Sequence, residues 1–263
     1  MIAPLWVKSF DEGNVPHTAD KLRLLYPQDY VLKNSPEHLE QFNRFLADLS
    51  QATGSEVSCI SISEMWEKYP PPNVKDQNIH EYLKDVIVNT YYWSFYDSQA
   101  WLRETYLKEH GKSPFVNAFV KWRWGLGQSV TDAQHEEGMR RLPVYRSWLL
   151  DQVLLQHGNN AVLILPISES APNYRDKPPS EPSIQSGFDP LYLSPILGSP
   201  DLVLPIGQIP YDSKVTGCAE ILPVCVTLVG KPGGDADLIK LARSVFQSSG
   251  RPSIIRTGSS MFG

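Results

Sequence analysis

The segment LPVCVTLVGKPGGDADLIKLARSVF (222–246) decides the fold, because it predicts a strand, a tight turn and a helix in direct succession. Its first part is almost continuously apolar, which is typical of a strand buried on both faces. Glycines follow at positions 230, 233 and 234, and Asp235 stands where a helix N-cap is expected. Gly250 is expected to end the helix. Its predicted apolar face comprises Leu238, Ile239, Ala242, Val245 and Phe246.

The glycine-rich turn GKPGGD (230–235) raises the question of a phosphate site. A P-loop needs a lysine after its last glycine, followed by Ser or Thr, whereas Lys231 follows the first glycine here. The dinucleotide pattern G-x-G-x-x-G is also absent. We therefore interpret the turn as one that lets the last helix pack closely on the preceding strand.

Four more apolar runs predict strands: LRLLY (22–26), VSCISI (57–62), AVLILPI (161–167) and DLVLPIG (201–207). Between the first two, Ser35 and Pro36 predict a helix start and Gly54 its end. This strand–helix–strand unit favours parallel pairing. The sequence thus predicts an α/β protein with a mixed β-sheet of five or six strands flanked by helices on both faces.

Residues 77–158 predict a helical, aromatic-rich insertion within a single domain that spans 1–263. The pattern from Ile79 to His110 is helical, and KSPFVNAFVKWRWGLGQ (112–128) is expected to be an aromatic and glycine-rich connector. Thr131 and Gln134 predict a capping box that opens a further long helix. Pro143 lies inside that helix and is expected to kink or divide it.

Composition narrows the class of protein. A net charge of −5 and a pI near 5.7 give no basic excess for binding nucleic acid. No run reaches 18 apolar residues and the N-terminus is not a secretory signal, so we expect no membrane span and a cytoplasmic location. Three cysteines give no even disulfide framework, which favours a reducing compartment. We expect Cys59 and Cys225 to be buried thiols.

The usual catalytic and metal motifs are missing. The six histidines form no metal-binding pair, and HEEGMRR (135–141) is expected to be a solvated helix face. There is no G-x-S-x-G elbow, and the one GSS stretch lies in the tail RTGSSMFG (256–263), where a rigid nucleophile site is not expected. We therefore expect no metal and no cofactor.

The aromatic stretch KWRWGLG (121–127) leaves two interpretations open. Trp122 and Trp124 are expected on one side of the connector with Arg123 between them. They either fill the core, with the arginine reaching the surface, or form a wall of an apolar substrate pocket. The stretch YYWSFY (91–96) allows the same two interpretations.

Several motifs together resemble the amidase signature family, and in particular its large fungal members. These motifs are RLLYPQDY (23–30), KWRWGLG, NYRDKPP (173–179), GFDPLYLSPILGSPDLVLPIGQIPY (187–211) and the opening segment, 222–246. The resemblance covers nearly the whole chain and implies the C-terminal half of an amidase signature fold. Cys225 stands where the family usually has glycine.

The family resemblance also implies what is missing. Family members use a Ser–cis-Ser–Lys triad in a glycine- and serine-rich core, and this sequence has no segment like GGSSGG. No catalytic residue is therefore assigned. The loops before the strand at 201–207 contribute to the family's acyl pocket, which implies substrate-binding roles for Asp189, Tyr192 and Ser194. A half-sheet is also expected to leave edge strands and an apolar face open.

Three hypotheses about function remain open. The chain is the substrate-pocket or structural half of an amidase, inactive alone in amide hydrolysis; or a repurposed non-hydrolytic biosynthetic enzyme, such as a cyclase or dehydratase; or a non-catalytic binding partner. The expected ligand is a small-molecule amide or an apolar metabolite. The expected protein partner is a second copy in a homo-oligomer or a separate N-terminal amidase half, with neither nucleic acid nor membrane as a partner.

Overall fold

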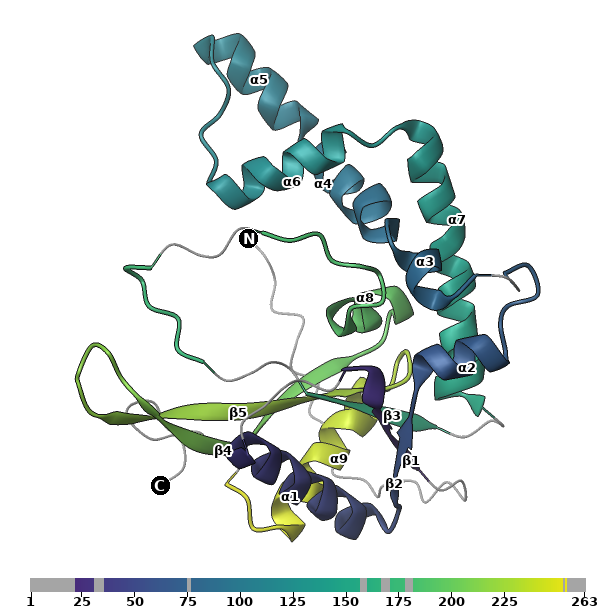
Figure 1. Cartoon of the computed structure of the whole chain (residues 1–263), viewed down its shortest axis with the longest axis vertical. Helices are drawn as coiled ribbons and strands as arrows, with labels where there is room; N and C mark the ends of the chain where they lie inside the picture. Colours follow the sequence, from purple (N-terminus) through teal and green to yellow (C-terminus); the bar gives the residue numbers. More distant parts are fainter. Residues whose placement is uncertain are drawn as a thin grey trace.

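The computed structural model describes residues 22–30, 36–74, 77–156, 160–166, 171–177, 182–252 and 254. A five-stranded mixed sheet forms its centre, in the order β2-β1-β3-β5-β4 (Figure 1). The strands are β1 (Arg23–Pro27), β2 (Val57–Ile60), β3 (Ala161–Pro166), β4 (Asp201–Asp212) and β5 (Ala219–Val229). The predicted fold class and the five strands are confirmed.

Strand directions follow from the connections. β1 pairs in parallel with β2 and with β3, and the long helix α1 (Pro36–Thr53) connects β1 to β2 as predicted. β5 runs antiparallel to both β3 and β4. β4 and β5 form a long hairpin whose far end extends beyond the other strands (Figure 1). β4 is an outer strand and carries Pro205 and Pro210, in keeping with the confinement of proline to sheet edges.

Helices cover both faces of the sheet. On one face, α1 and α9 (Asp235–Ser248) bury Phe42, Phe45 and Phe246 against β3, β4 and β5. The core on the other face is built around Trp66 of α2 (Ile62–Lys68) and Tyr145 of α7 (Asp132–Leu149). The short helices η1 (Gln28–Tyr30), η5 (Pro190–Tyr192) and α8 (Leu193–Leu197) complete that side. The apolar face that we expected to remain open is therefore covered by helices.

The helices from α3 onward lie between β2 and β3 in the chain and rise from the sheet as an arm (Figure 1). It comprises α3 (Ile79–Leu83), the π-helical turn η2 (Val88–Tyr92), α4 (Trp93–Asp97), α5 (Ala100–His110), α6 (Ala118–Gln128), α7 and the π-helical turn η3 (Leu150–Leu154). The Thr131–Gln134 capping box is confirmed. Pro143 lies within α7, which remains one helix, so of the two expected effects, a kink or a division, the division is wrong.

Other expectations are wrong at the level of single residues. The segment 112–128 is not simply a connector, because Asn117 caps a helix, α6, by accepting a hydrogen bond from the Val120 N–H at 2.8 Å. Cys59 is exposed because it lies on the outer strand β2, and Cys225 is half-buried. The side chain of His135 is not merely solvated, because its ring stacks on that of Trp93 at 3.7 Å between centroids.

The glycine-rich turn GKPGGD (230–235) packs as predicted, apart from the N-cap of the helix that follows it. Gly233 has φ +74°, a left-handed conformation that favours glycine. A Cβ at Gly230 would lie 3.5 Å from the ring of Pro200, so the strand end is closely packed. Gly234, and not Asp235, is the N-cap of α9. Asp235 instead places a carboxylate in the first helical turn, where the helix dipole favours negative charge.

Candidate functional site

Tyr192 belongs to the segment η5–α8 and is a neighbour of Tyr92 in the helical arm. It ends η5, whose N-cap Asp189 accepts a hydrogen bond from the Leu191 N–H at 3.0 Å. The Tyr192 hydroxyl donates to Gln185 Oε1 at 3.1 Å. Burial raises the pKa of Tyr192 well above its ordinary value, and the neighbouring Tyr92 hydroxyl raises it further. The phenol therefore stays protonated at neutral pH and serves as a hydrogen-bonding group.

Arg123 faces the same place from α6. Its guanidinium carbon lies 4.4 Å from the ring centre of Phe119 and 5.9 Å from those of Tyr91, Tyr92 and Phe95. Its Nε is buried and has no hydrogen-bond partner within the described ranges. The positive charge of Arg123 lowers the pKa of Tyr192, against the larger effect of burial. The two side chains are thus electrostatic neighbours.

Trp122 belongs to this group of side chains and Trp124 does not. The Trp122 ring lies 5.8 Å from that of Tyr92 and 5.8 Å from that of Phe119. Trp124, with 9% of its surface exposed, donates from Nε1 to Gln99 Oε1 at 2.9 Å in the interior of the arm. The expectation that both rings share one side is wrong, because residues two apart in a helix point in nearly opposite directions.

We call Trp122, Arg123, Tyr92 and Tyr192 the aromatic corner. Tyr92 comes from η2, and π-helical turns are often found at functional sites. The four residues come from α6, η2 and η5, so the corner exists only because the arm folds over the η5–α8 segment. It offers aromatic faces, one cationic guanidinium and two phenol hydroxyls. This combination suits a polar group attached to an apolar or aromatic body.

Asp189 and Ser194 support the corner rather than join it. Asp189 caps η5, and the Ser194 hydroxyl donates to the Ser199 carbonyl at 2.9 Å. The Ser199 N–H in turn donates to the Ser194 carbonyl at 3.1 Å, which closes the turn after α8. Their substrate-binding roles stay predictions.

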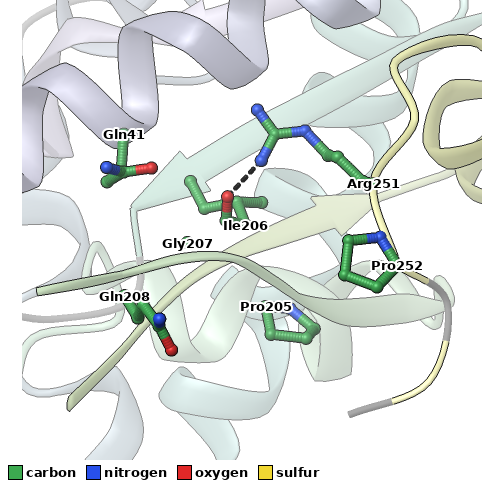
Figure 2. Close-up of a pocket in the computed structure, with 7 residues that line it drawn as sticks. All are labelled: Gln41, Pro205, Ile206, Gly207, Gln208, Arg251 and Pro252. Carbon is green, nitrogen blue, oxygen red and sulfur yellow. Dashed lines mark hydrogen bonds between the residues drawn. The ribbon is translucent and has the colours of Figure 1, made fainter. Parts of the chain in front are cut away.

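Among the described residues, two surface cavities lie elsewhere. One, of about 200 Å³, lies between α1, the irregular part of β4 and the segment after α9; Figure 2 shows the residues that line it. There Arg251 Nη1 donates to the Ile206 carbonyl, and Arg251 Nη2 forms an ion pair with Asp48 at 2.6 Å. The other, of about 460 Å³, lies between the prolines at 70–72 and α7. None of the predicted site residues lines either cavity.

A further polar cluster surrounds Asp29. Its carboxylate accepts hydrogen bonds from the Ile62 N–H at 2.6 Å, from the Ser63 N–H at 3.2 Å and from both the Ser61 and Ser63 hydroxyls. Burial raises the pKa of Asp29, but these hydrogen bonds together hold it below its ordinary value. Ser61 also caps α2 by accepting from the Glu64 N–H, as predicted. These hydrogen bonds fix the start of α2, and we assign the cluster no role beyond this structural one.

Metal chemistry and membrane spanning find no support in the described ranges. No group of three or more histidine, cysteine, aspartate or glutamate side chains there is placed to hold a metal ion. Likewise, none of the helices described combines the length and apolar character needed to cross a bilayer.

Comparisons with known proteins define the fold. No protein-family model matches the chain. Among solved structures, a bacterial aryl acylamidase of the amidase signature family is similar, with a TM-score of 0.56 at 15% identity over 88% of this chain and 44% of that one. 6-Aminohexanoate cyclic dimer hydrolase complexed with substrate gives 0.52 at 18% identity, over 87% and 45%. The urea amidolyase of K. lactis gives 0.57 at 14% identity, over 92% and 13%.

The chain therefore has the fold of part of an amidase signature enzyme. It spans less than half the length of these solved structures. At this level of identity the likeness establishes the fold alone, so activity and substrate have to be argued from the residues.

Proposed function

We propose that this chain is the substrate-pocket half of an amidase-signature protein and does not hydrolyse amides by itself. The proposal extends to its organisation: one domain over 1–263, in which 77–158 is an insertion that supplies the pocket wall. The observation that carries it is the aromatic corner. Hydrolysis by the family's route needs a serine nucleophile, a second serine as proton relay and a lysine base.

The missing triad supports inactivity of the isolated chain. The sequence has no GGSSGG-like segment, so no residue is assigned to the nucleophile, the relay or the base. The hydroxyls of Ser61, Ser63 and Ser194 instead make structural hydrogen bonds. The proposal requires a serine- and lysine-bearing core from outside residues 1–263, which we expect an N-terminal amidase half to supply, and the cytoplasm is the location that we expect.

An apolar or aromatic amide is the ligand that best fits the corner. The partly exposed ring of Trp122 offers contact area, and the Tyr192 hydroxyl, whose proton is donated to Gln185, can accept a hydrogen bond from an amide N–H. The aryl acylamidase and the cyclic dimer hydrolase named above are proteins of this fold whose names denote action on amides.

Two measurements on the pure chain test the proposal. The first is hydrolysis of an aryl acylamide that releases a coloured aniline, together with labelling by a serine-directed fluorophosphonate. We expect neither turnover nor labelling. Robust turnover by the chain alone overturns the proposed inactivity.

The second measurement is binding of the same amide, followed by tryptophan fluorescence. We expect Trp122→Leu and Tyr192→Phe to weaken binding about tenfold, since an aromatic contact or a hydrogen bond contributes on the order of 1 kcal/mol. Trp101→Ser is the matched control, because Trp101 is 74% exposed and lies outside the corner. Equal affinity in all variants contradicts the assignment of the corner as the pocket wall.

A further inference from the structure

The free end of the arm exposes large apolar side chains. We define the arm tip as α5, the segment 111–117 that follows it and the first turn of α6. Trp101 is 74% exposed, Leu107 51% and Phe115 94%. No residue of α5 is buried, although aromatic residues of this size are mostly buried in proteins. Figure 1 places α5 at the far end of the molecule, away from the sheet.

Charge is segregated along the same segment. Residues 100–121 carry four Lys and Arg against two Glu, a net charge of +2, in a chain whose total is −5. The rest of the chain therefore carries −7. Lys108, Lys112 and Lys121 are exposed and form no ion pair within the described part of the chain. The tip is thus a protrusion that combines exposed apolar side chains with a net positive charge on an acidic molecule.

These two properties together select the kind of partner. A protruding surface of Trp, Phe and Leu with lysines between them matches the boundary between lipid headgroups and acyl chains, where aromatic rings lie at the interface and lysines reach the phosphates. A protein partner would need a matching hollow, whereas a fluid bilayer adapts to a protrusion. The negative remainder of the molecule is repelled by the same surface, which orients the tip toward it.

We propose that the arm tip docks on an anionic lipid surface, with Trp101, Leu107 and Phe115 at the headgroup level and Lys108 and Lys112 on the phosphates. This is surface attachment and not a membrane span, in keeping with the absence of a spanning helix in the described ranges. It departs from the expectation, drawn from the sequence, that no membrane is a partner. The proposal stands independently of the proposed function, because none of the tip residues belongs to the aromatic corner.

Sedimentation of the full chain with vesicles tests the proposal. The vesicles contain either phosphatidylcholine alone or phosphatidylcholine mixed with phosphatidylserine. We expect binding to the mixed vesicles, weaker binding to the neutral ones, and a decrease with added salt. Trp101→Ser/Phe115→Ser is expected to lower the partition coefficient by at least about tenfold, since it removes two large apolar side chains. Lys108→Glu/Lys112→Glu is expected to abolish the preference for phosphatidylserine.

Val215→Ser is the matched control, because Val215 is 78% exposed but lies at the end of the β4–β5 hairpin. It should bind vesicles like the parent chain. All these positions are exposed, so we expect each variant to fold. Its circular dichroism spectrum and melting temperature should equal those of the parent chain. No binding of the parent chain to mixed vesicles overturns the proposal, as does equal binding by the Trp101→Ser/Phe115→Ser variant. A lipid-free dimer or larger assembly that the same variant dissociates also overturns it, in favour of a second copy as the occupant.

Discussion

Gly127 of α6 lies against the backbone of Tyr92 in η2, with no room for a side chain between them. A Cβ at position 127 would be 2.9 Å from the Tyr92 carbonyl carbon and 2.6 Å from the Cβ of Tyr96. Gly127→Ala must push two helical segments apart, so we expect a loss of about 1–3 kcal/mol in the free energy of unfolding. Urea unfolding followed by circular dichroism measures this loss.

Gly125 provides the control for Gly127 within the same helix. A Cβ at Gly125 would meet no atom within 4 Å. Gly125→Ala should therefore stabilise the chain by up to about 1 kcal/mol, because alanine favours a helix over glycine. If both substitutions stabilise equally, the close approach of α6 to η2 is wrong, and with it the geometry of the aromatic corner.

Arg251 ties the segment after α9 to α1 and β4. Its guanidinium pairs with Asp48 and donates to the Ile206 carbonyl, and the two charged side chains are only 17% and 26% exposed. Arg251→Gln leaves a partly buried carboxylate without its partner, so we expect a loss of about 2 kcal/mol in unfolding free energy. Arg44→Gln is the matched control, because Arg44 is 65% exposed and its ion pair with Glu40 is 3.9 Å long. Its effect should remain within about 0.5 kcal/mol.

Asp29 holds the start of α2 from a different segment of the chain. Asp29→Asn weakens four hydrogen bonds to Ser61, Ile62 and Ser63, so we expect a loss of about 1–2 kcal/mol at neutral pH. Asp85→Asn, at an exposed position, should leave the melting temperature nearly unchanged. A melting temperature of Asp29→Asn equal to that of the parent chain would show that the carboxylate charge is unimportant there.

Glu137 predicts a pH dependence on the arm. Hydrogen bonds from Arg140 and Arg141 lower its pKa to about 2. Because the folded pKa lies below the unfolded value, this group contributes stability above pH 4.5 that is lost as the pH falls toward 2. Glu137→Gln should lower stability by at most about 1 kcal/mol at pH 7, since the pair is exposed, and have no effect near pH 2. A difference that grows in acid contradicts this assignment.

The sheet could be predicted from the sequence because each of its strands contains an apolar run. The runs at 57–62 and 161–167 agree with β2 and β3 to within two residues. Gly54 ends α1 with φ +64°, as its place in the sequence suggested. The length of β4 was underestimated, because its outer half, GQIPYD, has neither a continuous apolar run nor a strict alternation.

The site could be predicted only in part, because it depends on contacts between distant segments. The expected connector at 112–128 contains α6, whose glycines at 125 and 127 argue against a helix by propensity alone. Close packing against η2 explains Gly127, which no local pattern indicates. The sequence indicates Arg123 only as a residue between two tryptophans. Its place beside Tyr192 depends on a fold that brings together positions 69 residues apart.

The arm tip and the aromatic corner therefore differ in how much of each the sequence indicates. The tail stretch RTGSSMFG (256–263), where no nucleophile site is expected, lies outside the described residues. Within the arm, charge and aromatic content are visible in the sequence, but exposure is not. Trp101 and Trp124 are alike in sequence, yet one is 74% exposed and the other 9%.

The two prolines of the outer strand β4 limit how this protein can misassemble. Proline has no N–H to offer to a neighbouring strand, and Arg251 already occupies the carbonyl of Ile206 on the same strand. A foreign strand that approached β4 would find its ladder interrupted at positions 205, 206 and 210. The two prolines and Arg251 therefore disfavour pairing of further strands with β4, and so disfavour fibril formation at this edge, even at high protein concentration.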